Sequence, residues 1–314
     1  MLIQVVRRLA AAFPVMGMVA FIVFLLLHLT PGDPAAVMAG DQATLQDIES
    51  IRKRLGLDRP LYEQFGLWVW SLVRGDLGTS LYSNLPVAQL IGQRLEPTLL
   101  LTVMTMVIAI VTAIPIGILA AWKAGTLVDR CVMALGVFGF SVPIFVVGYA
   151  LIYVFSIVLG WFPVQGYKSL EQAGLWLALH SLVLPSLALG MVYIALIARI
   201  TRASILEILS EDFIRTARAK GVGTGRLLMV HALRNAAVPI VTVVGIGFAL
   251  VISGVVVTET VFNIPGLGRM VVDAILNRDY PVIQAMIMLF SGVYVVINVL
   301  IDVAYCLLDP RIRY

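Results

Sequence analysis

The sequence predicts an all-α, polytopic membrane protein with six transmembrane helices and both chain ends in the cytoplasm. Of its 314 residues, 61% are hydrophobic and 13% are charged, with a mean hydropathy of +1.00. Soluble proteins carry about 45–50% apolar and about 25% charged residues. Apolar runs of roughly 20 residues match the ~30 Å hydrocarbon core of a bilayer. The sequence contains six such runs: 9–29, 98–121, 131–158, 178–199, 237–260 and 282–306.

The first run follows Arg7 and Arg8, as the apolar core of a signal peptide would. Its apolar part is much longer than the ~7–15 residues of such a core, which predicts an uncleaved first span. Six spans place both chain ends on one side of the membrane. Positive charges concentrate in short cytoplasmic loops. If both chain ends are cytoplasmic, 13 of the 22 Lys and Arg residues lie in segments on the inner side. We therefore expect both ends inside.

The spans divide the chain into an N-terminus with the first span (1–30), an extracytoplasmic helical segment (31–96), a five-helix core with a cytoplasmic loop at 203–235 (97–306), and a cytoplasmic tail (307–314). In the extracytoplasmic segment, Thr44 and Asp47 resemble a capping box that starts a helix, and a second helix is expected from Pro60. Residues 75–78 form a Gly-Asp-Leu-Gly turn, and a short helix at 86–95 leads into the second span. The segment is either a small helical cap or a surface that receives an external delivery partner.

Prolines and glycines inside the predicted spans indicate bends and close contacts. Pro143 follows Ser141 and Val142 in the middle of the third span, where proline removes a backbone hydrogen bond and kinks the helix. Two interpretations of Ser141 and Pro143 remain open, a kink that lines a pathway or a kink that serves packing alone. Gly245 and Gly247 in the fifth span are expected to allow close helix contact.

Few polar side chains fall within the spans. Asn298 and Asp302 lie one helical turn apart near the inner end of the last span, and a charge at that depth needs a partner or water. They are expected either to pair with an arginine at the inner rim or to take part in transport. Glu259, at the outer end of the fifth span, has the same two interpretations. Cys131 and Cys306 are expected to be reduced thiols that bind no metal.

Between the fourth and fifth spans, a short charged segment is predicted to form a separate helix. Ser210 is expected as its N-cap, acidic residues occupy its first turn, and Gly221 suits the left-handed conformation that ends a helix. Phe213, Ile214 and Ala217 form a small apolar stripe, and such a stripe facing the cytoplasm requires a partner. The predicted docking helix comprises Phe213, Ile214, Arg215, Thr216, Ala217, Arg218, Ala219, Lys220 and Gly221.

The sequence has no pattern typical of an enzyme, such as a nucleophile with a base, a metal cluster or a nucleotide loop. The glycine-rich run at 221–225 lacks a preceding strand and the Gly-Lys-Ser/Thr ending of a phosphate-binding loop. Thr224 is instead expected to cap a helix at 225–235. The net charge of +4 follows from the inner basic flanks and predicts no nucleic-acid partner. These observations favour a pore driven by a separate soluble protein, with a self-sufficient secondary transporter or a structural scaffold as alternatives.

Several short motifs occur in a fixed order along the chain: Pro31-Gly32-Asp33-Pro34, Leu55-Gly56-Leu57-Asp58, Gly75-Asp76-Leu77-Gly78, Arg215–Gly221, His231–Ala236, Val261–Gly268, Arg278–Pro281 and Asp309–Arg313. Together they resemble the permeases of ATP-binding-cassette (ABC) importers over essentially the whole chain. The first-permease subunit of the dipeptide/oligopeptide/nickel branch, which includes glutathione importers, is the most similar. The general importer motif begins Glu-Ala-Ala and later has Leu-Pro. This chain has Arg215-Thr216-Ala217 and Leu233-Arg234 there, the variant of that branch, which puts in doubt any contact assigned to the missing Glu.

The resemblance implies a type I ABC importer permease fold in a bacterial inner membrane, in contact with its lipid. It implies that this chain pairs with a second, homologous permease, each forming half of a pathway for di- or oligopeptides or related small solutes. Two cytoplasmic ATPase subunits would bind ATP and Mg²⁺ and dock on residues 213–221, and an extracytoplasmic solute-binding protein would deliver the substrate. No cofactor is expected in this chain itself. The substrate stays open among dipeptides, oligopeptides, glutathione and nickel complexes.

Overall fold

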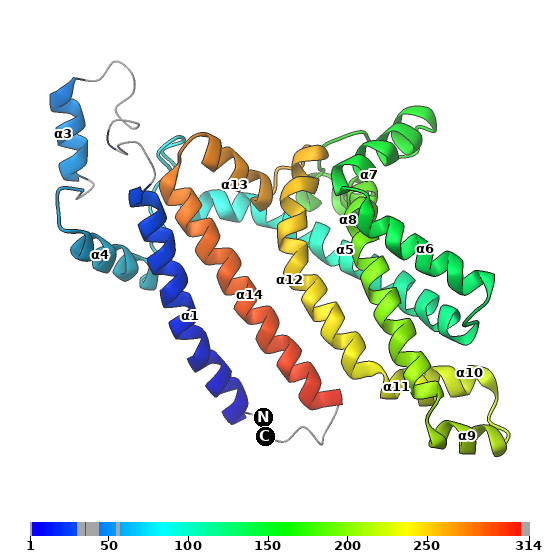
Figure 1. Ribbon diagram of the computed structural model, residues 1–314. Helices are drawn as coiled ribbons and strands as arrows, with labels where there is room; N and C mark the ends of the chain where they lie inside the picture. The colour runs from blue at the N-terminus through cyan, green and yellow to red at the C-terminus, as the bar shows by residue number, and fades with distance from the viewer. Residues whose placement is uncertain (1, 30–34, 36–43, 55–56, 309–314) are drawn as a thin grey trace. The chain divides into compact units, whose positions relative to one another are not determined.

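The computed structural model describes residues 2–29, 35, 44–54 and 57–308 (Figure 1). These residues form helices joined by turns, and the β-type pairing among them is an isolated bridge between Thr79 and Pro86. The predicted all-α class is therefore confirmed for the described part of the chain. The sequence motifs at 31–34 and 309–313 lie outside the described residues, as does Gly56.

Two short helices start where the sequence predicts, α3 directly after Thr44 and α4 directly after Pro60. The elements are, in order, α1 (Leu2–Leu29), α3 (Leu45–Arg54), α4 (Leu61–Val73), α5 (Val87–Trp122), α6 (Leu127–Ser141), α7 (Ile144–Leu151), the π-helix η1 (Ile152–Val158), α8 (Leu170–Leu209), α9 (Asp212–Ala219), α10 (Thr224–Arg226), the π-helix η2 (Leu227–Ala232), α11 (Leu233–Asn235), α12 (Ala237–Val261), α13 (Leu267–Leu276) and α14 (Tyr280–Leu308).

Four helices in the described chain are long and apolar enough to cross a membrane: α5, α8, α12, and α14 over Tyr280–Tyr305. The pair formed by α6 and the segment Ile144–Val158 adds a fifth if the bent pair counts as one span. The first predicted run, 9–29, lies in α1, whose shorter apolar stretch covers Ala10–Leu25. Four or five of the six predicted spans thus coincide with helices of spanning length.

Two of these helices extend well beyond the predicted spans. α5 joins the expected short helix at 86–95 to the second span as one helix of 36 residues, with Pro97 and Pro115 inside it. α8 is 40 residues long and contains Pro185. Near its start, Gly174 has φ +77° and ψ 169°, a conformation that glycine takes far more readily than any other residue.

The chain divides into two compact units. One unit contains Pro97–Gly268 and Ile297–Tyr314, and the other contains Leu2–Glu96 and Arg269–Val296. The long helices α5 and α14 therefore each contribute one end to each unit.

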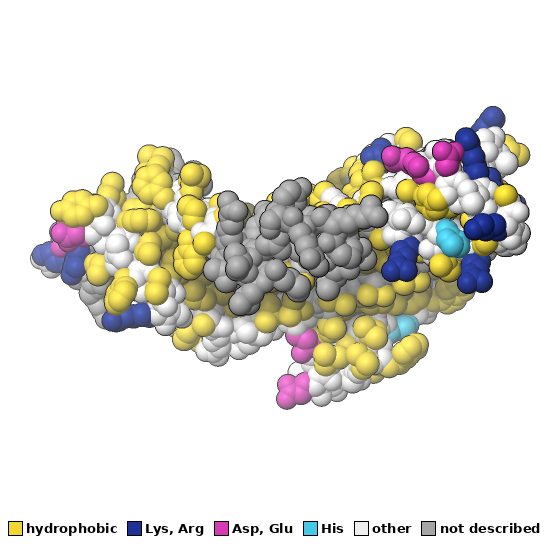
Figure 2. Space-filling model, turned by 90° about the horizontal axis from the view of Figure 1, so that it is seen from below, with side chains coloured by type: hydrophobic (Ala, Val, Ile, Leu, Met, Phe, Trp, Pro, Cys, Tyr) yellow, Lys and Arg dark blue, Asp and Glu magenta, His cyan; other side chains and the backbone are white. Residues whose placement is uncertain are grey.

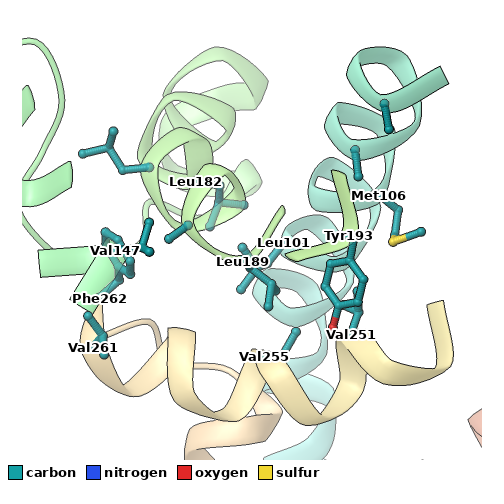
Figure 3. Packing of buried hydrophobic residues seen from close by; sticks show 14 of the residues in the cluster. Leu101, Met106, Val147, Leu182, Leu189, Tyr193, Val251, Val255, Val261 and Phe262 are labelled. Carbon is teal, nitrogen blue, oxygen red and sulfur yellow. The ribbon is translucent and has the colours of Figure 1, made fainter. Parts of the chain in front are cut away.

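The core of the first unit is built around α8, which packs against α6, α7 and α12. Figure 3 shows its buried side chains converging from α5, α7, α8 and α12. The fully or almost fully buried members include Leu101, Met106, Leu182, Leu189, Tyr193, Val251 and Val255. Inside a bilayer such close packing, rather than exclusion of water, holds helices together.

Small residues bring these helices close to one another. A Cβ at Gly117 of α5 would lie 2.7 Å from the carbonyl oxygen of Ala198 in α8. On α12, a Cβ at Gly245 would overlap the side chain of Ile301, and one at Gly247 would lie 3.2 Å from Met106 Cε. The predicted role of Gly245 and Gly247 in close helix contact is confirmed.

In the second unit, aromatic rings join α1 to α4, with the ring centroids of Phe24 and Phe65 5.3 Å apart. The predicted turn at 75–78 is confirmed, because Gly75 and Gly78 both have φ near +80° and the Gly78 N–H donates to Asp76 Oδ1 at 2.9 Å. Asp279 is buried and accepts the Ser80 hydroxyl at 2.5 Å. This carboxylate ties the loop after the turn to the start of α14.

Candidate functional site

The predicted docking helix is α9, an eight-residue helix that follows α8 after only two residues. Its N-cap is Glu211, which has extended backbone angles. The prediction that Ser210 is the N-cap is wrong. Ser210 has helical angles at the end of α8, and its hydroxyl donates to the carbonyl oxygen of Glu207 at 2.7 Å. The hydroxyl is thereby committed to the preceding helix.

The end of α9 forms as the sequence predicts. Gly221 has φ +78°. Its N–H donates to the Arg218 carbonyl at 2.9 Å, and the Val222 N–H donates to the Ala217 carbonyl at 3.1 Å. This pair of bonds is a Schellman motif. A Cβ at Gly221 would meet nothing within 4 Å, so the position requires glycine for its backbone angle and not for space.

The apolar stripe of α9 is divided between the interior and the surface. Ile214 is fully buried, Phe213 is 43% exposed and Ala217 is half-buried. The helix packs against η2, so Ile214 fixes α9 to the chain while Phe213 stays accessible. The remaining residues of the predicted docking helix are exposed: Arg215, Thr216, Arg218, Ala219 and Lys220.

The helical segment after α9 starts at Thr224, one residue earlier than expected, and runs through α10, η2 and α11 to Asn235. Thr224 is its first helical residue and Gly223 its N-cap, so the expected capping role of Thr224 is wrong. Leu228 and Ala232 of η2 are buried in a second cluster. That cluster joins the segment to three long helices through Ile118 and Ala121 of α5, Ile205 of α8, and Ile240 of α12.

Seen from below, Lys and Arg side chains gather at the end that carries α9 to α11, on the right in Figure 2. An apolar ring at Phe213 and several cations thus lie on one small helix that is anchored from behind by Ile214. An arrangement of this kind suits a protein partner with an apolar recess and negative charge around it.

The predicted kink in the third span is confirmed and is larger than an ordinary proline kink. α6 ends at Ser141, α7 begins at Ile144, and the axes of the pair differ by 105°. Pro143 is the N-cap of α7, and the Ser141 hydroxyl donates to the Val137 carbonyl at 2.9 Å. Ser141 and Pro143 are both exposed. Their role in lining a pathway stays a prediction.

Glu259 lies fully buried near the end of α12. Thr98 of α5 donates its hydroxyl to Glu259 Oε1 at 2.5 Å, and the same hydroxyl oxygen accepts the Leu267 N–H at 2.8 Å. A Cβ at Gly266 would overlap the carboxylate. Glu259 was expected from the sequence, but Thr98 and the glycines that pack against the carboxylate were not. The two glycines of the Pro-Gly-Leu-Gly motif could have indicated this close packing.

Asn298 and Asp302 lie on α14, where Asn298 is exposed and Asp302 half-buried. Both take part in interactions within the chain. Pairing of Asp302 with an arginine stays a prediction. A second buried acidic residue, Asp129 of α6, was not expected from the sequence and bonds Arg202 of α8, 73 positions further along the chain. No local pattern connects residues so far apart. Cys131 is a free, exposed cysteine.

Two family matches cover nearly the whole chain. Residues 113–314 match the family described as "Binding-protein-dependent transport system inner membrane component". Residues 1–102 match its N-terminal companion, "Binding-prot-dependent transport system membrane comp, N-term".

Full-length relatives and solved structures agree with these matches. The chain is 54% identical, over 99% of both chains, to the "Probable peptide ABC transporter permease protein y4tP" of Sinorhizobium fredii. It is 46% identical, over 100% of both chains, to the "Glutathione transport system permease protein GsiC" of Escherichia coli K12. An inward-facing structure of the MetNI methionine ABC transporter shares the fold, with a TM-score of 0.58 at 18% identity over 71% of this chain and 97% of that one.

Proposed function

This chain belongs to the family of inner-membrane components of binding-protein-dependent transport systems, and we propose that it forms half of the translocation pathway of an ABC importer for peptides or related small solutes. The observation that carries the proposal is the exposed surface of α9. One of its apolar residues, Ile214, is buried, and its remaining surface offers Phe213 and several cations to a partner.

The proposed topology has six spans with both ends in the cytoplasm of a bacterium and the chain in its inner membrane. Four helices of spanning length, the bent pair formed by α6 and Ile144–Val158, and the apolar stretch of α1 support it. The excess of Lys and Arg in the short loops between spans supports the orientation. In this topology α9 to α11 are cytoplasmic, and residues 31–96 form an extracytoplasmic segment.

The proposed assembly contains a second, homologous permease, two cytoplasmic ATPases and an extracytoplasmic solute-binding protein. The ATPases bind ATP and Mg²⁺, and one of them docks on α9. Movement of α9 then reaches the spans through the cluster that joins η2 to α5, α8 and α12. The break at Ser141 to Pro143 is the proposed lining of the pathway, because a bent span frees backbone groups that a water-filled path can satisfy.

The substrates proposed for the importer are short peptides, with glutathione among them. The names of the relatives support this class, since one is a peptide permease and another a glutathione permease. The solute-binding protein supplies most of the selectivity in the proposed assembly. Thermal shift measurements on that partner with di-, tri- and oligopeptides, glutathione and chelated nickel would identify the ligand, because a ligand at 100 times its Kd adds about 2.7 kcal/mol.

Deleting the cognate ATPases tests the main proposal against a self-sufficient secondary transporter. We expect uptake of the radiolabelled substrate to stop, while the permease remains inserted in the membrane. Uptake that survives the deletion would favour the secondary transporter. Ala217→Trp provides a local version of the test, because a bulky ring at this half-buried position pushes α9 away from its own support and its partner. Uptake is expected to be lost with normal insertion, and normal uptake would contradict the docking role.

A further inference from the structure

An ion pair between a buried aspartate and a half-buried arginine joins α6 to α8 close to the end that carries α9. Asp129 lies in the first turn of α6 and is 4% exposed. Its two carboxylate oxygens accept from Arg202 of α8, Oδ1 from Nε and Oδ2 from an Nη at 2.7 Å. Oδ2 also accepts the Gly125 N–H at 2.9 Å. Bidentate arginine–carboxylate pairs fix both the distance and the orientation of the groups they join.

This trio of Asp129, Arg202 and the Gly125 N–H is called the α6–α8 clamp below. It holds the loop between α5 and α6 as well as the two helices, since Gly125 belongs to that loop. One residue before Arg202 on α8, Thr201 approaches α5 so closely that a Cβ at Gly117 would lie 2.7 Å from Thr201 Cβ. Three long helices are therefore joined within one turn of α8.

The contact between α6 and α8 continues away from the clamp. Near the other end of α6, a Cβ at Gly139 would lie 3.2 Å from the Met191 carbonyl oxygen and 3.3 Å from Ala195 Cβ. Asp129 thus faces Arg202, and ten positions later Gly139 faces the stretch from Met191 to Ala195. The two helices run antiparallel and are held together at both ends of α6.

The two ends of this helix pair lead to different parts of the proposed machinery. At the clamp end, α8 continues after two residues into α9. At the other end, α6 reaches the 105° break and α7, which packs on α8 and α12. Figure 1 shows α9 at one end of α8 and α7 near the other.

We propose that the α6–α8 clamp makes α6 follow α8 when a docked ATPase moves α9, so that the motion reaches the break in the third span. The inference rests on the proposed function, because it requires an ATPase on α9. Asp129 and Arg202 are positioning residues in this scheme, since they act through the helices they join. Without the clamp, α6 is held to α8 through the packing around Gly139 alone, and less of the motion of α9 reaches the break for each ATP hydrolysed.

The test uses the whole complex, with both permeases, both ATPases and the cognate binding protein, reconstituted in liposomes. Uptake and ATP hydrolysis are measured per assembled complex, and their ratio is the readout. Removing Arg202 alone leaves the buried Asp129 carboxylate without its partner and threatens folding, so the main variant is the neutral pair Asp129→Asn/Arg202→Met. The asparagine side-chain oxygen can still accept the Gly125 N–H. The variant therefore removes the ion pair and retains the contact with the loop.

We expect the neutral pair to assemble, to keep its basal ATP hydrolysis, and to lose roughly 2- to 30-fold in substrate transported per ATP, the range of coupling changes seen for residues between two sites. Arg202→Lys, which keeps the charge but loses the two-point contact, is expected to lie between the neutral pair and the wild type. Arg130→Gln is the matched control, because Arg130 is the exposed neighbour of Asp129, and its ratio is expected to equal that of the wild type.

Three results would overturn the clamp proposal: a neutral pair with a wild-type ratio, a proportional fall in hydrolysis and uptake, or failure of the neutral pair to assemble. The last two would assign the ion pair to structural support alone. A wild-type complex without ATP-dependent uptake would instead contradict the proposed function, so the two failures are distinguishable.

Discussion

The two ends of the α5–α8–α12 bundle are built on different principles. At the Glu259 end, a fully buried carboxylate, the hydroxyl of Thr98 and the backbone of Leu267 are packed against glycines with no room for a methyl group. At the α9 end, the eight-residue helix presents most of its residues at the surface and is attached through Ile214. One end suits a fixed support and the other suits a part that a partner can move. Substitutions at the two ends should therefore fail in different ways.

The largest effect is expected from Gly268→Ala at the Glu259 end. A Cβ at Gly268 would lie 2.7 Å from the Cα and 2.9 Å from the N of Val256. Because these atoms belong to the backbone of α12, the overlap can be relieved only by moving the helix itself. The stability of the fold is expected to fall by about 3 kcal/mol, the upper part of the range for overpacked cores. The amount of assembled complex, measured by size-exclusion chromatography after thermal challenge, should collapse.

Gly92→Ala is the control for this change. Gly92 is also a helical glycine, and a Cβ there would meet nothing within 4 Å. Alanine is the better helix former by about 1 kcal/mol, so this variant should be at least as stable as the wild type. A stable Gly268→Ala complex would show that the Glu259 end tolerates movement and would remove the contrast between the ends.

A second, smaller effect is expected from Thr98→Val. Valine has nearly the shape of threonine but neither donates to Glu259 nor accepts the Leu267 N–H. Leaving buried groups without these bonds costs about 1–3 kcal/mol. The melting temperature of the complex should fall accordingly, and uptake should fall only as far as the amount of folded complex does.

The matched control is Thr112→Val on the same helix. The Thr112 hydroxyl bonds the Ile108 carbonyl of its own helix at 2.6 Å, and that carbonyl already accepts a backbone bond in a regular helix. Little change in melting temperature is expected. Equal losses for the two threonines would mean that the Glu259 network contributes nothing beyond an ordinary hydroxyl.

The same contrast explains what could be predicted from the sequence. The positions of long helices follow from the lengths of apolar runs, and Gly221 follows from the local geometry of a helix end, so both were predictable. The burial of Ile214 beside an exposed Phe213 was not, because it depends on where η2 lies. Likewise, no periodicity or spacing in the sequence predicts a contact between distant segments. The bonds of Thr98 to Glu259 and of Arg202 to Asp129 are contacts of this kind.

Ser210 shows how a correct local rule can assign a residue to the wrong helix. Serine is favoured at an N-cap because its hydroxyl accepts a backbone N–H. Here only two residues separate α8 from α9, and the hydroxyl donates backward to Glu207 instead. The sequence of the segment fits both roles, and the length of α8 decides between them.

At the α9 end, Gly221→Val should act on transport rather than on the fold. A β-branched side chain would meet no neighbouring atoms at Gly221, but the φ of +78° would strain it by on the order of 1–2 kcal/mol. This strain would act on the end of the short helix α9. Uptake is expected to be lost while the complex keeps its melting temperature. Faster hydrogen exchange at the α9 amides would locate the effect.

Gly223→Val controls for the added side chain in the same loop. Gly223 has φ −62° and ψ 148°, which valine adopts without strain, and a Cβ there is also in open space. Its uptake should equal that of the wild type. If both variants lost uptake alike, bulk in the loop rather than the left-handed backbone would be responsible.

The smallest effect is expected from Arg215→Gln. Arg215 Nη1 lies 3.2 Å from Asp212 Oδ1, but the two side chains are 73% and 94% exposed, and such pairs contribute little to stability. The melting temperature should not change. If α9 is a docking helix with a basic face, uptake should still fall, by no more than about fivefold, the equivalent of ~1 kcal/mol for a charge at the rim of an interface. A fall in uptake that grows weaker at high salt would identify the lost interaction as electrostatic, whereas unchanged uptake at low salt would exclude Arg215 from the contact and leave Phe213 as its centre.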